Sequence, residues 1–397
     1  MSLSAMPGKR LAVARVGDRI NRPSHLATAP NRFQGWSELG EKRDMPGPLA
    51  GLRVVEFAAL GPAPFGAMLL SDLGAEVLRI DRADAAWPQM PIVSRGRSGL
   101  TLDLKSDEGR ARAMAAMDAA DVAIEGLRPG VMERLGLGPD TACVRNDRLI
   151  YARMTGWGQD GPRAQAAGHD INYIGLTGLL AMLSPEGEAP RPPLNLLGDY
   201  AAGSLYLVIG ILAALAERSR SGKGQMVDAA IVDGSVSLMA PILGMIAGGL
   251  MPADPNKGLL AGNAPYYRSY LCADGLAIAV GPLEPQFRRA LTGAMGLDSD
   301  ALNGEPVAAA QMLAKQFATQ PREYWLAPLD SVDACATPIH DWQAARADPH
   351  LVARGVFGGD GPVPDPAVAP RFSRTPGAAQ PDGDGAELLD RWIGQSR

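Results

Sequence analysis

The sequence predicts an α/β protein in which a Rossmann-like parallel sheet is followed by a smaller α+β domain. In the first half of the chain, short apolar runs alternate with helical segments, which is typical of a parallel sheet with helices on both faces. From about Asn263 the pattern changes to a hairpin-like pair of strands and further helices. The length of 397 residues, of which 46 % are hydrophobic and 20 % charged, suffices for two to three domain-sized units.

The strands and helices of the parallel sheet follow one another in a regular order. Each apolar run is short enough for a strand, and Gly/Pro loops or helical segments separate the runs. The expected strands cover 52–57, 75–80, 99–104, 121–126, 149–156 and 225–231. The expected helices run up to Leu73, over 107–119, briefly after Pro129, and as long apolar helices after His169, Asp199 and Ile231.

The uncharged stretch from Gly234 to Ala253 is nearly long enough to cross a bilayer. It contains Pro241 and several glycines, so we expect a buried helix with a break and no membrane span.

The second half predicts a hairpin over 266–281, helices over 284–295 and 307–318, and a strand over 335–340. A Pro/Gly/Asp-rich tail then ends in a short helical segment. The expected parts are a flexible N-terminal extension (1–47), a large domain (48–235), a linker helix (236–262), a small domain (263–355) and a C-terminal segment that returns to the large domain (356–397).

The N-terminal 47 residues are rich in arginine and poor in acids, which weakly resembles an organelle transit peptide. An upstream start codon ahead of a domain that begins near Met45 is the simpler interpretation.

Composition limits the partners and the compartment. A net charge of −5 gives no general attraction to nucleic acid or to an anionic membrane, so an anionic ligand needs a local basic cluster. Three widely spaced cysteines, Cys143, Cys272 and Cys335, fit a reducing compartment, and cytoplasm is the default.

His169 is the one histidine in a suggestive context. It stands in Gly168-His169-Asp170, where an apolar helix should begin, with Asp170 expected as the N-cap. The positive end of a helix dipole disfavours imidazolium, so the ring is expected to stay neutral and to be able to accept a proton. A capping or packing role is the alternative for this residue.

Asp199 stands in a similar context, directly before a long apolar run, and it is expected to be a helix N-cap. Capping alone would explain it. However, His169 and Asp199 each follow a glycine and each open an apolar helix, and paired acid/base groups at helix starts make a plausible proton-transfer site.

Basic residues gather where the predicted strands end. Arg82, Lys105 and Arg128 fall near the carboxyl edge of the sheet, where phosphates can be held without a P-loop. The segment Gly156–Gly161 formally matches a dinucleotide fingerprint, but neither an amphipathic helix nor a suitably spaced acid follows it. The sequence has no zinc-type spacing, Walker motif or serine-hydrolase elbow, so chemistry without a cofactor or metal is favoured.

The chain resembles the family III CoA-transferase (CaiB/BaiF-like) superfamily from about Pro48 to Thr375, and within it the branch that racemises 2-methylacyl-CoA thioesters. The segments that carry the resemblance are PLAGLRVVEFAALGPAPFGAMLLSDLGAEVLRIDR, TLDLKSDEGR, IEGLRPGVMERLGLGP, RLIYARMTGWGQDGP, AGHDINYIGLTG, PLNLLGDY and GKGQMVDAAIVDGS.

The resemblance implies an interlocked homodimer that acts on acyl-CoA without a separate cofactor. It assigns the catalytic pair to His169 and Asp199 and adds Glu284, which the partner subunit supplies to the site. The positions it implies for CoA contacts are Arg82, Leu102, Asp103, Leu104, Lys105, Gly126, Leu127, Arg128, Arg134, Gly168, Ile171, Asn172 and Tyr173.

Two alternatives stay open. A CoA-transferase of the same superfamily would use Asp170 as the nucleophile, although such enzymes commonly carry an aromatic residue where this chain has His169. A non-catalytic acyl-CoA-binding module would keep the basic positions but would not need His169, Asp199 and Glu284 together. The acyl group itself, whether a bile-acid side chain, a branched fatty acid or an arylpropionate, is not encoded in a readable motif, and Phe65 leaves the acyl preference open.

Overall fold

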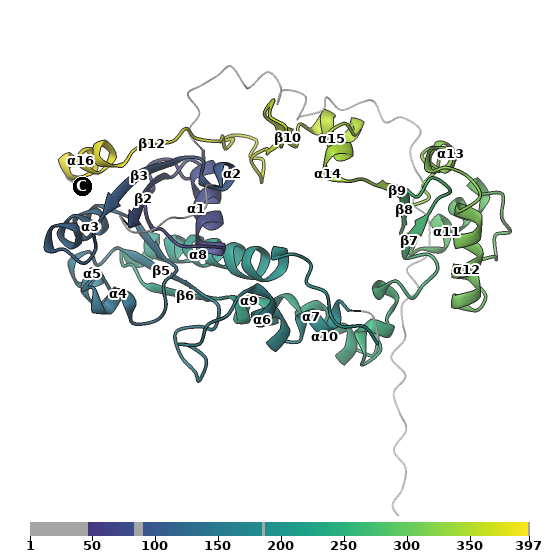
Figure 1. Ribbon diagram of the computed structural model, residues 1–397, viewed down its shortest axis with the longest axis horizontal. Coiled ribbons are helices and arrows are strands. Elements are labelled where there is room, and N and C mark those ends of the chain that lie inside the picture. Colours follow the sequence, from purple (N-terminus) through teal and green to yellow (C-terminus); the bar gives the residue numbers. More distant parts are fainter. Residues whose placement is uncertain (1–46, 83–89, 185–186, 396–397) are drawn as a thin grey trace, which may run out of the picture. The chain divides into compact units, whose positions relative to one another are not determined.

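The computed structural model describes residues 47–82, 90–184 and 187–395 (Figure 1). The expected N-terminal extension, residues 1–47, therefore lies outside the described residues except for its last position.

The expected parallel sheet is present, and within the described residues it has seven strands in the order β12-β3-β2-β1-β4-β5-β6. All neighbouring strands in it pair in parallel. The strands are β1 (Arg53–Phe57), β2 (Glu76–Arg82), β3 (Arg97–Leu102), β4 (Val122–Glu125), β5 (Ile150–Thr155), β6 (Met226–Ala230) and β12 (Gly383–Asp384).

The strand order reverses between β1 and β4, which is the point where ligands bind in open α/β sheets. The loops after these two strands touch, because a Cβ at Gly126 would lie 2.9 Å from the Cβ of Ala59. The fold thus brings the ends of β1 and β4 together at the carboxyl edge.

Helices cover both faces of the sheet (Figure 1). On one face, apolar side chains of α3, α5 and α16 join those of the strands in one core, while α1 and α8 complete a second core on the other face. The helices of this part are α1 (Pro62–Asp72), α2 (Pro91–Ser94), α3 (Asp107–Ala119), α4 (Val131–Arg134), α5 (Pro139–Arg145), α8 (Leu205–Ser221) and α16 (Gly385–Gly394).

The expectation of one long helix after His169 was wrong. The structure has two short helices, α6 (Asp170–Leu176) and α7 (Leu179–Met182), separated by Gly178. Gly178 adopts a φ of 87°, a left-handed conformation that ends a helix.

The segment Leu196–Ser221 is long and apolar enough to span a membrane by length and composition. Here it consists of a π-helix, η2 (Leu196–Ser204), and α8, whose residues Leu207 and Ile211 are buried in the second core. Its apolar character is therefore used in part for packing on the sheet.

The stretch from Gly234 to Ala253 has the expected break but is not the expected buried helix. Helices α9 (Ile231–Leu238) and α10 (Ala240–Ala247) meet at Met239, and none of the α10 residues is buried. Apolar composition predicted burial, whereas in the single chain this surface is open.

The second part of the chain forms an antiparallel sheet of β7 (Arg268–Leu271), β8 (Ala277–Val280) and β9 (Ala336–Ile339), in the order β7-β8-β9. Its own core includes Ile278, Leu313 and Phe317. Its helices are α11 (Pro285–Ala294), α12 (Pro306–Phe317) and α13 (Arg322–Leu329), of which α13 was not expected. Short elements lie before and after it: η3 (Pro255–Lys257), η4 (Leu259–Ala261), α14 (Trp342–Ala345), α15 (Pro349–Arg354), β10 (Phe357–Gly358) and β11 (Asp365–Pro366).

The C-terminal segment adds its two-residue strand β12 to the edge of the large sheet beside β3. Trp392 on α16 is 1 % exposed, and its indole N–H donates to Oε2 of Glu76 at 2.9 Å. The end of the chain is thus a structural part of the first sheet.

Candidate active site

His169 lies at the start of α6, as expected, but it is itself the N-cap, and Asp170 is the first helical residue. The backbone N–H of His169 donates to Oδ1 of Asn172 at 3.0 Å, which fixes the backbone at the helix start. The expectation that Asp170 is the cap was wrong because its carboxylate faces the 198–199 segment instead. The His169 side chain is exposed.

Asp199 lies in the first turn of the π-helix η2 and is not the expected N-cap of a long α-helix. The backbone carbonyl of Asp199 accepts a hydrogen bond from the Ser204 hydroxyl at 3.1 Å, and the same hydroxyl donates to the Pro62 carbonyl at 2.7 Å. Such wide turns are frequent at functional sites. Here the π-helix links Asp199 to the start of α1.

The Asp199 carboxylate is half-buried, and burial is the main reason that its pKa is raised above the ordinary value. A hydrogen bond from Nδ2 of Asn195 to Oδ2, 2.9 Å long, and the charge of His169 act in the opposite direction. The structure therefore brings His169 and Asp199 within electrostatic reach of each other, and the raised pKa of Asp199 favours its neutral form more than in a free carboxyl group.

Gly61 in the loop after β1 approaches Asp199 closely. A Cβ at this position would lie 3.3 Å from Oδ2 of Asp199, and the φ of 74° also favours glycine. The first loop of the sheet is therefore one wall of the site.

Tyr173 connects the GHDINY segment with the other site residues. Its hydroxyl donates to the Gly168 carbonyl at 2.5 Å, and its ring packs edge-to-face on Trp157 at 4.7 Å. Burial raises the pKa of Tyr173, Asp199 raises it further, and Arg128 opposes both. Tyr173, Asp199 and Arg128 thus share one region.

The glycine-rich match at Gly156 has a packing explanation. A Cβ at Gly156 would lie 2.0 Å from Cζ of Tyr173, so only glycine leaves room for the tyrosine ring. The motif serves this contact and does not open a dinucleotide-binding helix.

The expected CoA-contact positions lie at or after the ends of strands β2, β3 and β4. Arg82 ends β2, and Arg128 follows β4, with both side chains exposed. The side chains of Leu102 and Leu104 belong to the first core, so these two residues can meet a ligand only through their backbone. Gln165 ties the 161–168 loop to this edge by donating to the Pro129 carbonyl at 3.0 Å.

A buried ion-pair network beneath the Gly126–Arg128 loop was missed at the sequence level. Nε of Arg153 lies 2.8 Å from Oε1 of Glu125, and its Nη1 lies 2.8 Å from Oε1 of Glu133 on α4. Oε2 of Glu125 accepts the backbone N–H of Leu127 at 2.7 Å. The signal was present as charges inside the apolar runs 121–126 and 149–156.

Glu284 belongs to the second part of the chain, where it is the exposed N-cap residue of α11. Burial, and then the Glu284 carboxylate, raise the pKa of the Cys335 thiol nearby. Among the interactions of the described residues, none joins Glu284 to His169 or Asp199.

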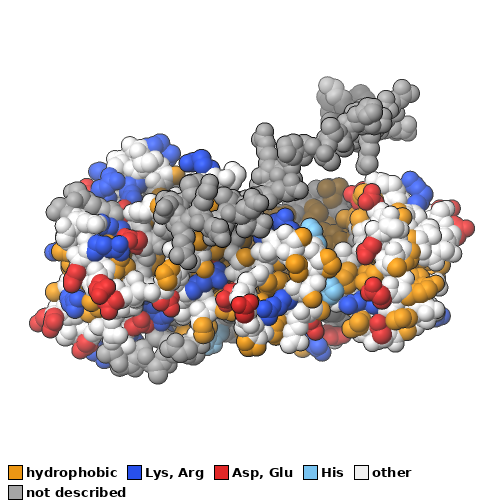
Figure 2. Space-filling view, turned by 90° about the horizontal axis from the view of Figure 1, so that it is seen from above, with side chains coloured by type: hydrophobic (Ala, Val, Ile, Leu, Met, Phe, Trp, Pro, Cys, Tyr) orange, Lys and Arg blue, Asp and Glu red, His pale blue; other side chains and the backbone are white. Residues whose placement is uncertain are grey.

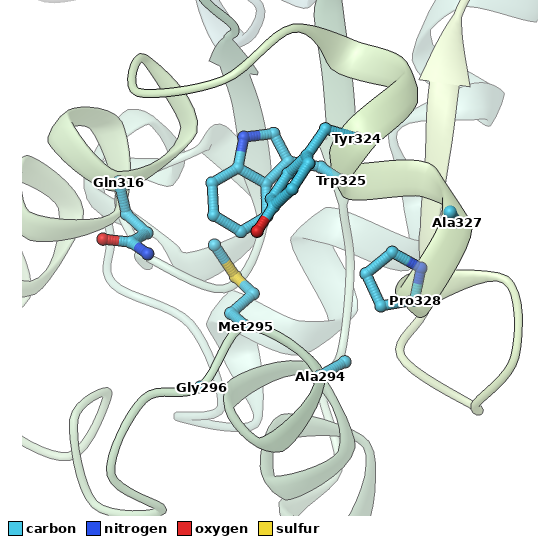
Figure 3. A pocket seen from close by; sticks show the side chains of 8 residues that line it. All are labelled: Ala294, Met295, Gly296, Gln316, Tyr324, Trp325, Ala327 and Pro328. Carbon is cyan, nitrogen blue, oxygen red and sulfur yellow. The ribbon is translucent and has the colours of Figure 1, made fainter.

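A cavity of about 560 Å³ in the second part of the chain is not a CoA site by its chemistry. The rings of Tyr324 and Trp325 lie beside Met295, with the Gln316 amide across from them (Figure 3). None of the lining residues is charged, so the cavity offers no charged partner for phosphates.

The surface also agrees with the charge composition. Figure 2 shows acidic and basic side chains interspersed over the face that it presents, without a continuous basic surface. Phosphate binding therefore depends on the local positions at the sheet edge.

Comparison with known proteins identifies the group to which the chain belongs. The model of CoA-transferase family III matches residues 49–383. The chain is 41 % identical to an alpha-methylacyl-CoA racemase of Mus musculus over 83 % of this chain and 87 % of the relative. It is 40 % identical to an alpha-methylacyl-CoA racemase of Homo sapiens over 78 % of this chain and 82 % of the relative.

A crystal structure of a CaiB/BaiF family protein from Brucella suis has the same fold. It superposes with a TM-score of 0.75 at 26 % identity, covering 87 % of this chain and 100 % of that one. On the family model, the relatives and the fold together, the chain belongs to CoA-transferase family III.

Proposed function

We propose that this protein interconverts the two epimers of a 2-methylacyl-CoA thioester by moving the proton on the carbon next to the carbonyl. The observation that supports this proposal is the arrangement of His169 and Asp199, which occupy neighbouring segments at one edge of the sheet and interact electrostatically. The names of the two mammalian relatives support the same reaction.

Racemisation requires a base on one face of the substrate carbon and an acid on the other. His169 removes the proton from one epimer while protonated Asp199 returns one to the opposite face, and the roles reverse for the other epimer. The raised pKa of Asp199 supports this assignment, because it favours the acid form that one direction needs.

The enolate oxygen that forms on proton removal needs hydrogen-bond donors. The backbone N–H groups of Asp170 and Ile171, in the first turn of α6, are suited to this task, because the initial N–H groups of a helix have no carbonyl partner within it. Proton transfer through an enolate moves no electrons to a carrier, so we propose that no cofactor besides the substrate's own CoA takes part.

The CoA moiety is proposed to lie along the carboxyl edge, with its phosphates near Arg82, Lys105, Arg128 and Arg134. The Gly126–Arg128 loop is suited to this role because Glu125 and Arg153 brace it from below. The GHDINY segment would then place the thioester beside His169.

We also propose a homodimer in which Glu284 of a second copy completes the site. Apolar side chains stay exposed on α8 and α10 in the single chain, including Ile209 at 58 % and Leu243 at 44 %, and such surfaces are typical of subunit interfaces. The three free cysteines support a reducing compartment such as the cytoplasm.

The deciding experiment incubates the full chain with one epimer of a 2-methylacyl-CoA in D₂O, without an acceptor acid. Deuterium incorporation at the α-carbon with loss of stereochemistry is the expected result. His169→Ala should abolish the exchange and leave CoA binding in place, whereas His350→Ala, which alters an exposed histidine of α15, serves as the matched control. If CoA moves to an added carboxylic acid and no exchange occurs, the proposal is wrong and the protein is a CoA-transferase.

A further inference from the structure

The carboxylate of Asp170 is committed to the backbone of the neighbouring catalytic segment. Oδ1 of Asp170 accepts the backbone N–H of Asp199 at 2.8 Å. Hydrogen bonds from N–H groups to a carboxylate are among the stronger ones in proteins. Asp170 therefore holds the backbone of Asp199, the second residue of the proposed acid/base pair.

Gly198 makes this hydrogen bond possible. A Cβ on Gly198 would lie 2.2 Å from Oδ1 of Asp170 and 2.9 Å from Cγ2 of Ile174. Asp170 and Ile174 both belong to α6, so any larger residue at 198 would push the Asp199 segment away from that helix. The close approach of the two segments therefore depends on Asp170 in one segment and on Gly198 in the other.

We infer that Asp170 is a positioning residue that sets the separation of His169 and Asp199, an inference that rests on the proposed racemase function. Its backbone is the first residue of the helix that His169 caps, and its side chain holds the backbone of Asp199. One residue thus spans the two halves of the proton-transfer pair, where small displacements of either half are costly.

The same geometry argues against Asp170 as an acyl acceptor. The residue is only 7 % exposed, and its Oδ1 is occupied by the hydrogen bond from the Asp199 backbone N–H. The other oxygen, Oδ2, is buried without a partner, so it is not open to a thioester from solvent. Oδ1 can accept a hydrogen bond in either protonation state of the carboxyl group, so the bond from the Asp199 N–H does not require a charged Asp170.

The test compares Asp170→Asn, which keeps an oxygen acceptor but loses the nucleophile, with Asp170→Ala, which loses both. We expect Asp170→Ala to lower kcat for α-proton exchange about 100-fold with KM within about 3-fold of the parent, and Asp170→Asn to recover to within about 10-fold. Asp140→Asn, at an exposed aspartate of α5, is the matched control. Asp170→Asn as inactive as Asp170→Ala would overturn the inference.

Gly198→Ala approaches the same contact from the other side and keeps the inference testable if Asp170→Ala does not fold. It should reproduce the loss of kcat, and its effect should not add to that of Asp170→Ala, because both break one contact. Full additivity in the double variant would contradict the inference.

A structural readout separates this inference from the proposed function. Hydrogen exchange of the Asp199 backbone amide should be slow in the parent and in Asp170→Asn but fast in Asp170→Ala. This result is expected whether or not the protein racemises the chosen substrate, whereas an unprotected Asp199 amide in the parent would refute the contact itself.

Discussion

The side-chain amide of Asn195 donates a hydrogen bond to Oδ2 of Asp199, with a distance of 2.9 Å between Nδ2 and Oδ2. This bond stabilises the carboxylate, while burial stabilises the neutral acid. A group that must take a proton from one epimer and give one to the other needs both forms within reach. The pairing of burial with Asn195 supplies this balance.

Replacing Asn195 with leucine should raise the pKa of Asp199 further, because the donor to the carboxylate is lost and burial remains. For the epimer that Asp199 deprotonates, kcat/KM falls as pH falls through this pKa, so the decline should begin at a higher pH than in the parent. For the other epimer, in which Asp199 is the acid, the decline at rising pH should shift upward as well. Profiles of kcat/KM against pH for each epimer check both shifts.

Asn303→Leu is the matched control for that experiment. Asn303 donates through its side-chain amide to Oδ1 of Asp300 at 2.7 Å in the second part of the chain. Its loss should leave both profiles in place, and unshifted profiles in Asn195→Leu would contradict the role given to Asn195.

Removing Arg153 should destabilise the part of the chain that forms the seven-stranded sheet. Arg153→Met leaves Glu125 buried without its ion partner, which typically costs about 3–5 kcal/mol of unfolding free energy. Arg145→Met breaks the exposed pair with Asp118 and should cost about 1 kcal/mol or less. Urea unfolding of both variants measures the difference, and equal losses would show that the buried network does not stabilise the loop.

A mixed dimer tests the role of Glu284. Glu284→Gln and His169→Ala chains with different tags are co-expressed and purified through both tags. If the second copy supplies Glu284, one of the two sites keeps both groups, and about half of the parental activity per dimer should return.

Two outcomes would count against that assignment. Activity that stays absent in the mixed dimer would place Glu284 in the same subunit as His169. Full activity in the Glu284→Gln homodimer would place Glu284 outside the site. A mixed dimer of His169→Ala with Asp199→Asn is the control. Because His169 and Asp199 of one site come from the same subunit, no intact site can form in this mixture.

Gly156→Ala should disturb Tyr173, whose ring occupies the space that the new methyl group would enter. Overpacking of this kind costs about 1–3 kcal/mol, and the displaced ring should also lower kcat/KM because Tyr173 interacts electrostatically with both Arg128 and Asp199. Gly293→Ala on α11, where nothing lies within 4 Å of the added atom, is the control. Thermal unfolding and α-proton exchange give the two readouts, and a fully active, stable Gly156→Ala would refute the packing explanation.

Much of the fold follows from local signals in the sequence. The helix expected over 107–119 is α3 (Asp107–Ala119), where the Ser106 side chain caps the Gly109 N–H and acids occupy the first turn. The parallel sheet follows from apolar runs at regular spacing. The two-residue strand β12 was not predictable, because its place is set by the edge of β3 and by the packing of Trp392, which lie far away in the sequence.

The sequence proposes residues for the candidate site but not their local geometry. Positions before apolar runs single out His169 and Asp199, and the family resemblance joins them as a pair. The π-helical turn at Asp199 was not predictable, because the same apolar run fits an α-helix, and the wide turn depends on Ser204 bonding to Pro62 of another element. The contact from Asp170 to Asp199 joins residues 29 positions apart, which no local pattern reveals.

The C-terminal segment affects how the sheet can fold during translation. Strand β12 and Trp392 come from the end of the chain, yet they pair with β3 and bond to Glu76, which are made near its beginning. Residues 383–392 must therefore leave the ribosome before this edge of the sheet can be covered. A nascent or prematurely terminated chain exposes an unpaired strand and an empty core position, which makes it a natural substrate for chaperones and proteases.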